Sequence, residues 1–359
     1  ELDIENAEKV NFFSQDELTN AILRVAASGD FRAYFLAVDD GLKLSDMSVI
    51  NDDLTQSLGW TTQEVSIFDL TGADSEIKLD DPNVDGQVLV IPGGSSPLSD
   101  SELAFVTDYV NKGGDLVILA AVGTNPDEPT LANSENLSNY LYENFGVRFT
   151  NEVVLDANLS AGSPQVPVAA TFDPGNFITS RFASDQYFVV FELPHPIEVS
   201  PTLPANVTVT ELLKSGDQSY AKTDIAAVLN NEITQADTDA KGPFVLGAAA
   251  ENTQTGGRVI LFGSPTVFTD LAGQRIVNNF IGEFSLVWAT RFDEFFSTVN
   301  VLSAPKAQDT PIFANDQVLR NINLLTIFVI PFGVLGIGFL VWWNNRERAP
   351  RNSAPNQEN

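Results

Sequence analysis

The sequence predicts an α/β fold: a Rossmann-like or flavodoxin-like parallel sheet with a β-rich insertion, followed by one C-terminal transmembrane helix. In the first 160 residues, apolar strand-like runs alternate with helical segments, which is typical of parallel sheets with helical crossovers. Beyond residue 160, short Thr- and Val-rich runs are separated by prolines, which favours a β-rich insertion. The hydrophobic fraction of 43%, with 25 phenylalanines, indicates a folded core.

The elements of the first half follow one another in strand–helix order. Strands are predicted at 32–38, 62–70, 86–92, 116–121 and 147–155, and helices at 44–60, 99–111 and 135–145. Ser99 and Glu102 have the spacing of a capping box, which predicts the start of the second helix. Gly59 and the pair Gly113-Gly114 stand where the first two helices should stop. The sheet is therefore expected to begin with four strands joined by helices.

Apolar strand patterns return after the insertion. Strands are predicted at 244–250 and 256–263, and a helix at 272–290. Gly256-Gly257 and Gly113-Gly114 are each followed by an apolar run. This similarity indicates that both strands enter the same sheet, although a turn sequence that is used twice explains it equally well.

These assignments divide the chain into seven segments. They are an N-terminal lead-in (1–29), a Rossmann-like α/β unit (30–159), a β-rich, Pro-rich insertion (160–240), the return of the α/β core (241–300), a juxtamembrane linker (301–320), the transmembrane helix (321–343) and a cytoplasmic tail (344–359). The chain begins at Glu1 and its one methionine is Met47. A signal peptide or a further membrane helix upstream of Glu1 would fit this start.

The transmembrane prediction comes from residues 324–343, which include no charged side chain. At about 1.5 Å of rise per residue, twenty residues cross a hydrocarbon core of about 30 Å. Trp342 and Trp343 stand where an interfacial aromatic belt is expected, and Arg346 and Arg348 follow. An excess of basic residues marks the cytoplasmic side, so we expect the C-terminus in the cytoplasm and the large N-terminal domain outside it.

Three small or rigid residues modify the predicted helix. Pro331 is expected to kink it. Gly333 and Gly336 lie three residues apart and offer a notch where another helix can approach closely. Glycines are also common in membrane helices without such a role, so a packing face and an ordinary glycine pair are both open.

The charge of the chain is strongly acidic and unevenly distributed. The formal net charge is −29, from 48 acidic and 19 basic side chains. Residues before 321 carry −30 and the remaining residues +1. Phosphate contacts need clustered Lys and Arg, so the composition excludes a nucleic-acid-binding protein. The acidity is expected on the extracytoplasmic domain.

Several kinds of catalytic or metal site are excluded by residue counts. The chain has no cysteine, which excludes thiolate metal sites and cysteine nucleophiles. Its one histidine, His195, lies between two prolines in a stiff segment, which favours a structural or capping role. Asp81, Asn83 and Asp85 match the first half of a calcium loop, but position twelve is Pro92, so an acidic turn is favoured. We therefore expect no cofactor and no metal site.

A loop of small residues, Gly93-Gly94-Ser95-Ser96, follows the third predicted strand and precedes a helix. Loops at this place in a parallel sheet bind anions and substrates. The loop has neither GxGxxG spacing nor a Walker lysine. It is a possible ligand or partner loop, and a tight connection is the alternative.

Several segments in sequence order resemble the GldG-type auxiliary component of ABC transporters, the family associated with gliding motility. The resemblance is carried by 18–25 leading to 33–36, by 98–117 with its Gly113-Gly114 pair, by 195–197 (His-Pro-Ile), by 257–264 followed by 278–280, and by a Pro-containing apolar helix running into Trp342-Trp343 and basic residues. Members commonly have a Gly-His-Gly-Glu turn after the first strand. This chain departs from it with Val38-Asp39-Asp40-Gly41.

The resemblance implies a membrane-anchored, non-catalytic partner of an ABC permease and its ATPase. It also implies a fold shared with a noncatalytic oligosaccharyltransferase subunit and an intraflagellar-transport protein. Two other functions remain as alternatives. One is a structural or assembly subunit of another membrane complex, and the other is an enzyme using paired carboxylates in one cleft.

Overall fold

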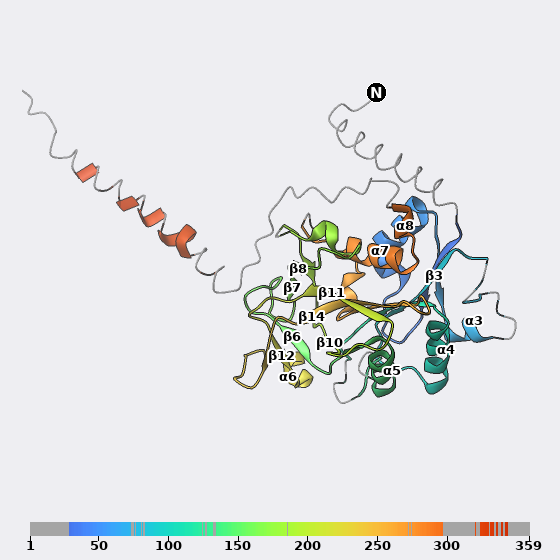
Figure 1. Cartoon of the computed structure of the whole chain (residues 1–359). Helices are drawn as coiled ribbons and strands as arrows, with labels where there is room; N and C mark the ends of the chain where they lie inside the picture. The colour runs from blue at the N-terminus through green and yellow to red at the C-terminus, as the bar shows by residue number, and fades with distance from the viewer. Residues whose placement is uncertain are drawn as a thin grey trace, which may run out of the picture. The chain divides into compact units, whose positions relative to one another are not determined.

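The computed structural model describes residues 29–296, except 73–74, 76, 80, 82, 124, 126–127, 132–133, 185, 272 and 274. Near the C-terminus it describes residues 320, 324–329, 331–333, 335–336, 339 and 342–343. The chain divides into two compact units, Glu1–Phe313 and Ala314–Asn359 (Figure 1). Residues 1–28 of the predicted lead-in, residues 301–319 of the predicted linker and the basic residues Arg346 and Arg348 lie outside the described residues.

The first unit is built around an eight-stranded sheet of mixed direction. The strand order is β2 (Thr61–Val65), β1 (Phe31–Leu36), β3 (Gly86–Pro92), β4 (Asp115–Leu119), β15 (Arg258–Phe262), β14 (Val245–Asn252), β11 (Val207–Lys214) and β8 (Thr171–Phe172). The first five strands are parallel, which confirms the parallel core. The last three are antiparallel additions, because a tight hairpin from β14 to β15 reverses the chain.

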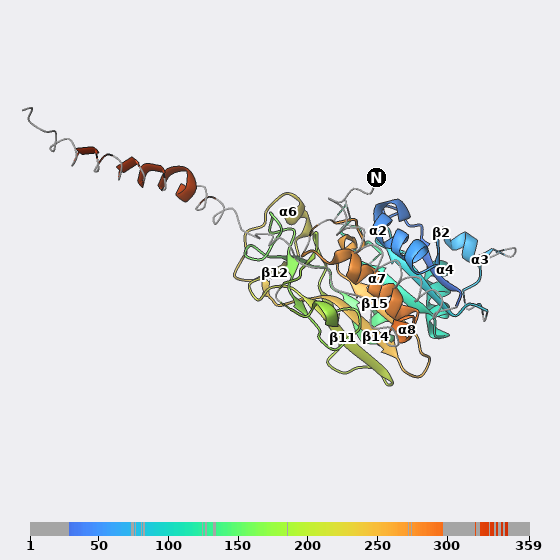
Figure 2. The ribbon, with the colours of Figure 1, turned by 90° about the horizontal axis from the view of Figure 1, so that it is seen from above.

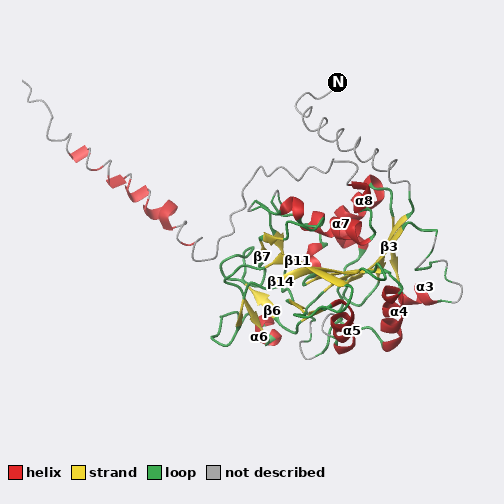
Figure 3. Cartoon of the chain, viewed as in Figure 1, coloured by secondary structure: helices red, strands yellow, loops and turns green. Residues whose placement is uncertain are grey.

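Helices cover both faces of this sheet (Figure 3). One face lies under α3 (Ile67–Thr71), α4 (Asp100–Asn111) and α5 (Glu135–Phe145). The other lies under α2 (Ser48–Asp52), α7 (Asn278–Ala289) and α8 (Asp293–Phe296), which Figure 2 shows near one another. Successive side chains of β1 alternate between the two cores: Phe35 packs on the α7 side and Tyr34 on the α4 side. The arrangement is a three-layer α/β domain.

The first crossover is helical as predicted, but the second strand is shorter than the sequence predicts. The helical stretch consists of a 3₁₀ turn (Leu44–Met47), α2 and a π-helical turn (Asp53–Ser57). The predicted strand 62–70 ends at Val65, because Ser66 caps α3. Its hydroxyl accepts from Asp69 N, and the Asp69 carboxylate accepts from Ser66 N. This local capping box overrides the strand pattern.

The strand predicted at 147–155 is two strands in two small sheets. Val147–Phe149 (β5) pairs with β10 (Ile197–Val199), and Val153–Leu155 (β6) pairs with β12 (Tyr220–Lys222). The predicted helix 272–290 starts only at Asn278. The insertion holds further short elements: β7 (Val168–Ala169), β9 (Val189–Val190), α6 (Ile225–Leu229), a 3₁₀ turn at Ser180–Phe182 and, at its end, β13 (Ala240–Lys241). A second 3₁₀ turn, Pro265–Val267, lies between β15 and α7. Two of its strands, β8 and β11, extend the main sheet.

The two strands that follow glycine pairs are neighbours in the sheet. Val259 is the register partner of Leu116, and β15 runs parallel to β4. The turns before them fit closely: Gly113 has φ +98°, and a Cβ there would lie 2.5 Å from Thr255 O. Only glycine fits that position without strain. The predicted common sheet is therefore confirmed.

The described residues of the second unit are helical and, apart from Arg320 and Thr326, apolar. They include a π-helical turn, Leu325–Val329. No helix among the described residues is both long enough and apolar enough to cross a membrane. Large apolar side chains here are each more than half exposed: Leu324, Leu325, Ile327, Phe328, Phe332, Leu335, Phe339, Trp342 and Trp343. Pro331, Gly333 and Gly336 are also helical, and among the described residues nothing outside the adjoining helical backbone lies within 4 Å of a Cβ built on either glycine.

Candidate functional site

The loops at the carboxyl ends of β1 and β3 lie side by side. Ser95 N donates to Asp39 O at 2.9 Å, and Leu42 N donates to Pro92 O at 2.9 Å. The loop 93–96 therefore meets the turn 39–41 at the edge where parallel sheets bind ligands. Asp39 and Asp40 are exposed, and Asp40 has φ +56°.

The two glycines of this loop are packed under neighbouring side chains. Gly93 and Gly94 are buried, with φ of +99° and +132°. A Cβ on Gly94 would lie 3.4 Å from side-chain atoms of both Val38 and Leu131. Ser95 is half-buried and Ser96 exposed. This geometry is that of a tight connection, and the ligand or partner role of the loop stays a prediction.

His195 is fully buried and joins the insertion to the main sheet. Its N–H donates to Gly263 O at 2.8 Å, and its Nδ1 lies 2.8 Å from Glu152 O. Burial lowers the pKa of His195, so the ring is neutral near pH 7. These contacts give His195 the structural role that its sequence context favours.

The segment 81–85, which matches the first half of a calcium loop, contains a hydrogen-bonded turn. Asp81 Oδ1 accepts from both Asn83 N and Asn83 Nδ2, at 3.0 and 2.8 Å. Asp85 Oδ2 accepts from Asp30 N at 2.7 Å. The two carboxylates therefore accept hydrogen bonds from different parts of the chain, as the acidic-turn interpretation expects.

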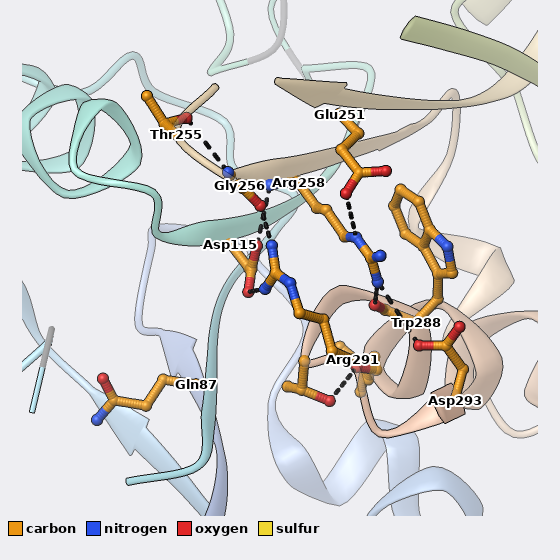
Figure 4. Close-up of polar contacts among 12 residues, drawn as sticks. Gln87, Asp115, Glu251, Thr255, Gly256, Arg258, Trp288, Arg291 and Asp293 are labelled. Atoms are coloured by element: carbon orange, nitrogen blue, oxygen red, sulfur yellow. Dashed lines mark hydrogen bonds and ion pairs between the residues drawn. The ribbon is translucent and has the colours of Figure 1, made fainter. Parts of the chain in front are cut away.

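A network of buried charges lies at the opposite edge of the sheet, where β4 and β15 begin (Figure 4). Asp115 is the first residue of β4 and is buried. Its Oδ1 accepts from Arg258 N at 2.9 Å, and its Oδ2 pairs with Arg291 Nη1 at 3.0 Å. Arg291 also donates to Gly256 O. Burial raises the pKa of Asp115 to about 7, although both arginines oppose this shift.

Arg258 links the network to the end of α7. Its guanidinium carbon lies 4.3 Å from the centre of the Trp288 ring, and it donates to Trp288 O. Its Nε pairs with Glu251 at 3.2 Å and its Nη1 with Asp293 at 3.5 Å. One side chain therefore connects β15, β14, α7 and α8, which is a structural function.

Sequence reasoning did not find this network. The one sequence signal is that each glycine pair is followed by a charged residue, Asp115 after Gly114 and Arg258 after Gly257. A charged residue at the start of a buried parallel strand needs a partner. The parallel register between the two strands supplies it.

A second group of buried charges lies between α7 and the turn after α2. Glu283 is 7% exposed, and burial, with a further contribution from Asp53, raises its pKa to about 8. Burial, with help from Asp52, raises the pKa of Asp53 to about 6. Arg181 opposes the shift of Glu283. Asp52 is exposed, whereas Asp53 is half-buried.

The fold is shared with a protein of very different sequence. The N-terminal domain of mmIFT52 matches with a TM-score of 0.50 and 15% identity, over 72% of this chain and 96% of that domain. A putative ThuA-like protein from Parabacteroides merdae matches with a TM-score of 0.39 and 10% identity, over 81% and 96%. No curated protein sequence matches the chain. The first match shows that the two proteins share a fold, a mixed α/β domain.

The family itself is defined by sequence. The family described as "ABC-type uncharacterized transport system" matches residues 53–290, from the π-helical turn after α2 to the end of α7. This match covers most of the chain, and the chain therefore belongs to this family of auxiliary components of ABC-type transport systems. The narrower GldG-type assignment stays a prediction.

Proposed function

We propose that the chain is a non-catalytic, membrane-anchored accessory subunit of an ABC-type transport complex, with its large domain on the extracytoplasmic side. The observation that carries the proposal is the family match over residues 53–290. In this role the α/β domain contacts a permease, and the C-terminal segment holds it at the membrane next to the permease and its ATPase.

The exposed apolar side chains of the second unit support the anchor. Phe332 and Leu335 are each 66% exposed, and Trp342 and Trp343 are more than half exposed. Contiguous exposed apolar surface marks a membrane or partner contact, because each Å² left in water costs about 25 cal/mol. Two adjacent tryptophans suit a membrane–water interface.

The contacts of the unusual charged groups support a non-catalytic role. Asp115 and Arg258 bind main-chain groups and charges of four elements of their own domain. His195 is held by main-chain carbonyls. These side chains hold elements together, as expected of a domain that works by contact with other subunits.

Purification of the tagged full chain from its native membranes in mild detergent is expected to recover a permease and an ATPase. A variant ending at residue 320 is expected to leave the membrane fraction and to lose both partners, since the anchor is removed. Quantitative mass spectrometry measures the recovery.

The double substitution of Gly333→Leu and Gly336→Leu serves as the matched control for this experiment. It keeps the apolar length and fills the notch, so it should stay in the membrane and recover less permease if the glycines are a packing face. Recovery of the full chain alone, or with subunits of a non-transport complex, would contradict the proposal.

A further inference from the structure

One edge of the main sheet is open along most of its last long strand. β8 pairs only with Leu213 and Lys214 of β11, through Phe172 and Thr171. Across residues 207–211, no strand of the described chain lies on the outer side of β11. At Leu212 the main-chain oxygen already accepts from Asp173 N at 2.9 Å. Open edges carry main-chain groups that can pair with another strand.

The register shows which main-chain groups face outward. Asn206 O accepts from Thr253 N at 2.8 Å, so residues 206, 208 and 210 exchange hydrogen bonds with the β14 side. The N–H and C=O of the alternate residue Val209 then point to the open edge. The regular alternation ends at Glu211, after which the register with β14 shifts. Val207 N, in the same series, donates to Pro204 O at 3.2 Å, away from β14.

A groove follows this edge. It has a volume of about 800 Å³ and is bounded by the turn 173–176, the segment 199–203 and the β11 residues Val209, Thr210 and Glu211. Leu203, on its wall, is 37% exposed. The edge sequence Val-Thr-Val-Thr has high strand propensity. A groove along an open edge of β-branched residues suits an extended peptide.

The charged side chains of the groove indicate which kind of segment it can bind. Glu211 and Asp173 line it together with Lys214, which pairs with Glu211 at 2.6 Å. A second copy of this chain would bring the same carboxylates to the contact and a net charge of −29 to each side, which opposes association. The three side chains leave one net negative charge, that of Asp173, whose Oδ1 accepts from Gly175 N and Asn176 N at 2.9 and 2.7 Å. An extended segment with Lys or Arg complements this charge.

We propose that a partner protein adds an extended, Lys- or Arg-containing segment to β11 as a ninth strand. Strand addition satisfies the outward N–H and C=O groups of Val209, and the basic side chain lies beside Glu211 and Asp173. The proposal depends on the proposed function only for naming the partner as a transporter subunit.

Hydrogen–deuterium exchange of the full chain tests the pairing directly. The Val209 amide should exchange at least tenfold more slowly in native membrane vesicles than in the detergent-purified chain without partners. The Thr210 amide already bonds to β14 and should change little. Equal exchange of Val209 in the two states overturns the strand proposal, whether or not a permease co-purifies.

Proline substitution gives a matched pair of variants. Val209→Pro removes an outward donor and leaves the β11–β14 ladder intact, so it should fold and bind the partner about tenfold more weakly. Thr210→Pro removes a ladder donor and should unfold the edge. A Val209→Pro chain that binds its partners as well as the unsubstituted chain overturns the proposal. Loss of all partners from the unsubstituted chain counts against the proposed function instead.

Discussion

Replacing Arg258 by alanine is expected to lower the free energy of unfolding by about 3–5 kcal/mol, the usual cost of breaking a buried ion pair. The guanidinium is buried, and its removal leaves Glu251 and Asp293 without their cation. It also removes the contact with the Trp288 ring. A loss of this size lowers the melting temperature of a domain this large by roughly 10 °C.

Arg148 provides a matched control for this prediction. It also pairs with a carboxylate, Glu198, at 2.7 Å and stacks on an aromatic ring, Tyr142, at 4.4 Å. Its side chain is 37% exposed, whereas that of Arg258 is 11% exposed. Arg148→Ala should therefore cost less than about 1 kcal/mol. Thermal unfolding of both full-length variants measures the difference, and equal losses would show that burial does not set the strength of the Arg258 network.

Replacing Glu283 by glutamine is expected to stabilise the protein at pH 8 and to change little at pH 5. The pKa of Glu283 is about 8 in the folded protein against an ordinary value of 4.5. Between these two values the folded state holds a proton that the unfolded state has lost, so stability falls as pH rises through this window. Below pH 4.5 both states are protonated and the penalty is absent.

The glutamine variant has no proton to lose and escapes this penalty. At pH 8 its gain over the unsubstituted chain should be roughly 2–4 kcal/mol, from about 1.4 kcal/mol per pKa unit. Urea unfolding at pH 5, 6.5 and 8 measures it. Exposed Glu143, on α5, is the control, and Glu143→Gln should give a difference that stays constant with pH. A Glu283→Gln variant that loses stability relative to the unsubstituted chain between pH 5 and 8 would contradict the prediction.

Elements with strong local signals could be predicted to the residue. The bounds of β3 and α5 coincide with those predicted from the sequence. The start of α4 is fixed by Ser99, whose hydroxyl accepts from Glu102 N, and α5 ends at Gly146 with φ +69°. Each signal depends on residues within four positions along the chain, which is why the sequence alone reveals it.

Elements that depend on distant residues could not be predicted in this way. The segment 147–155 divides because β5 and β6 pair with strands about 50 and 67 residues further along the chain. The candidate loop 93–96 was located correctly by its place between β3 and α4. The Asp115–Arg291 pair joins residues 176 positions apart. A local sequence pattern cannot predict a contact between residues so far apart along the chain.

The place of β15 between β4 and β14 constrains how the chain can be synthesised and folded. Strands β1 to β4 leave the ribosome first, and 138 residues separate Leu119 from Arg258. At about 5–20 residues per second, β15 is translated roughly 10–30 s after β4, its neighbour in the sheet. During that time the apolar run Leu116–Leu119 presents an unpaired edge that can aggregate. The nascent chain therefore exposes this strand edge until β15 is translated.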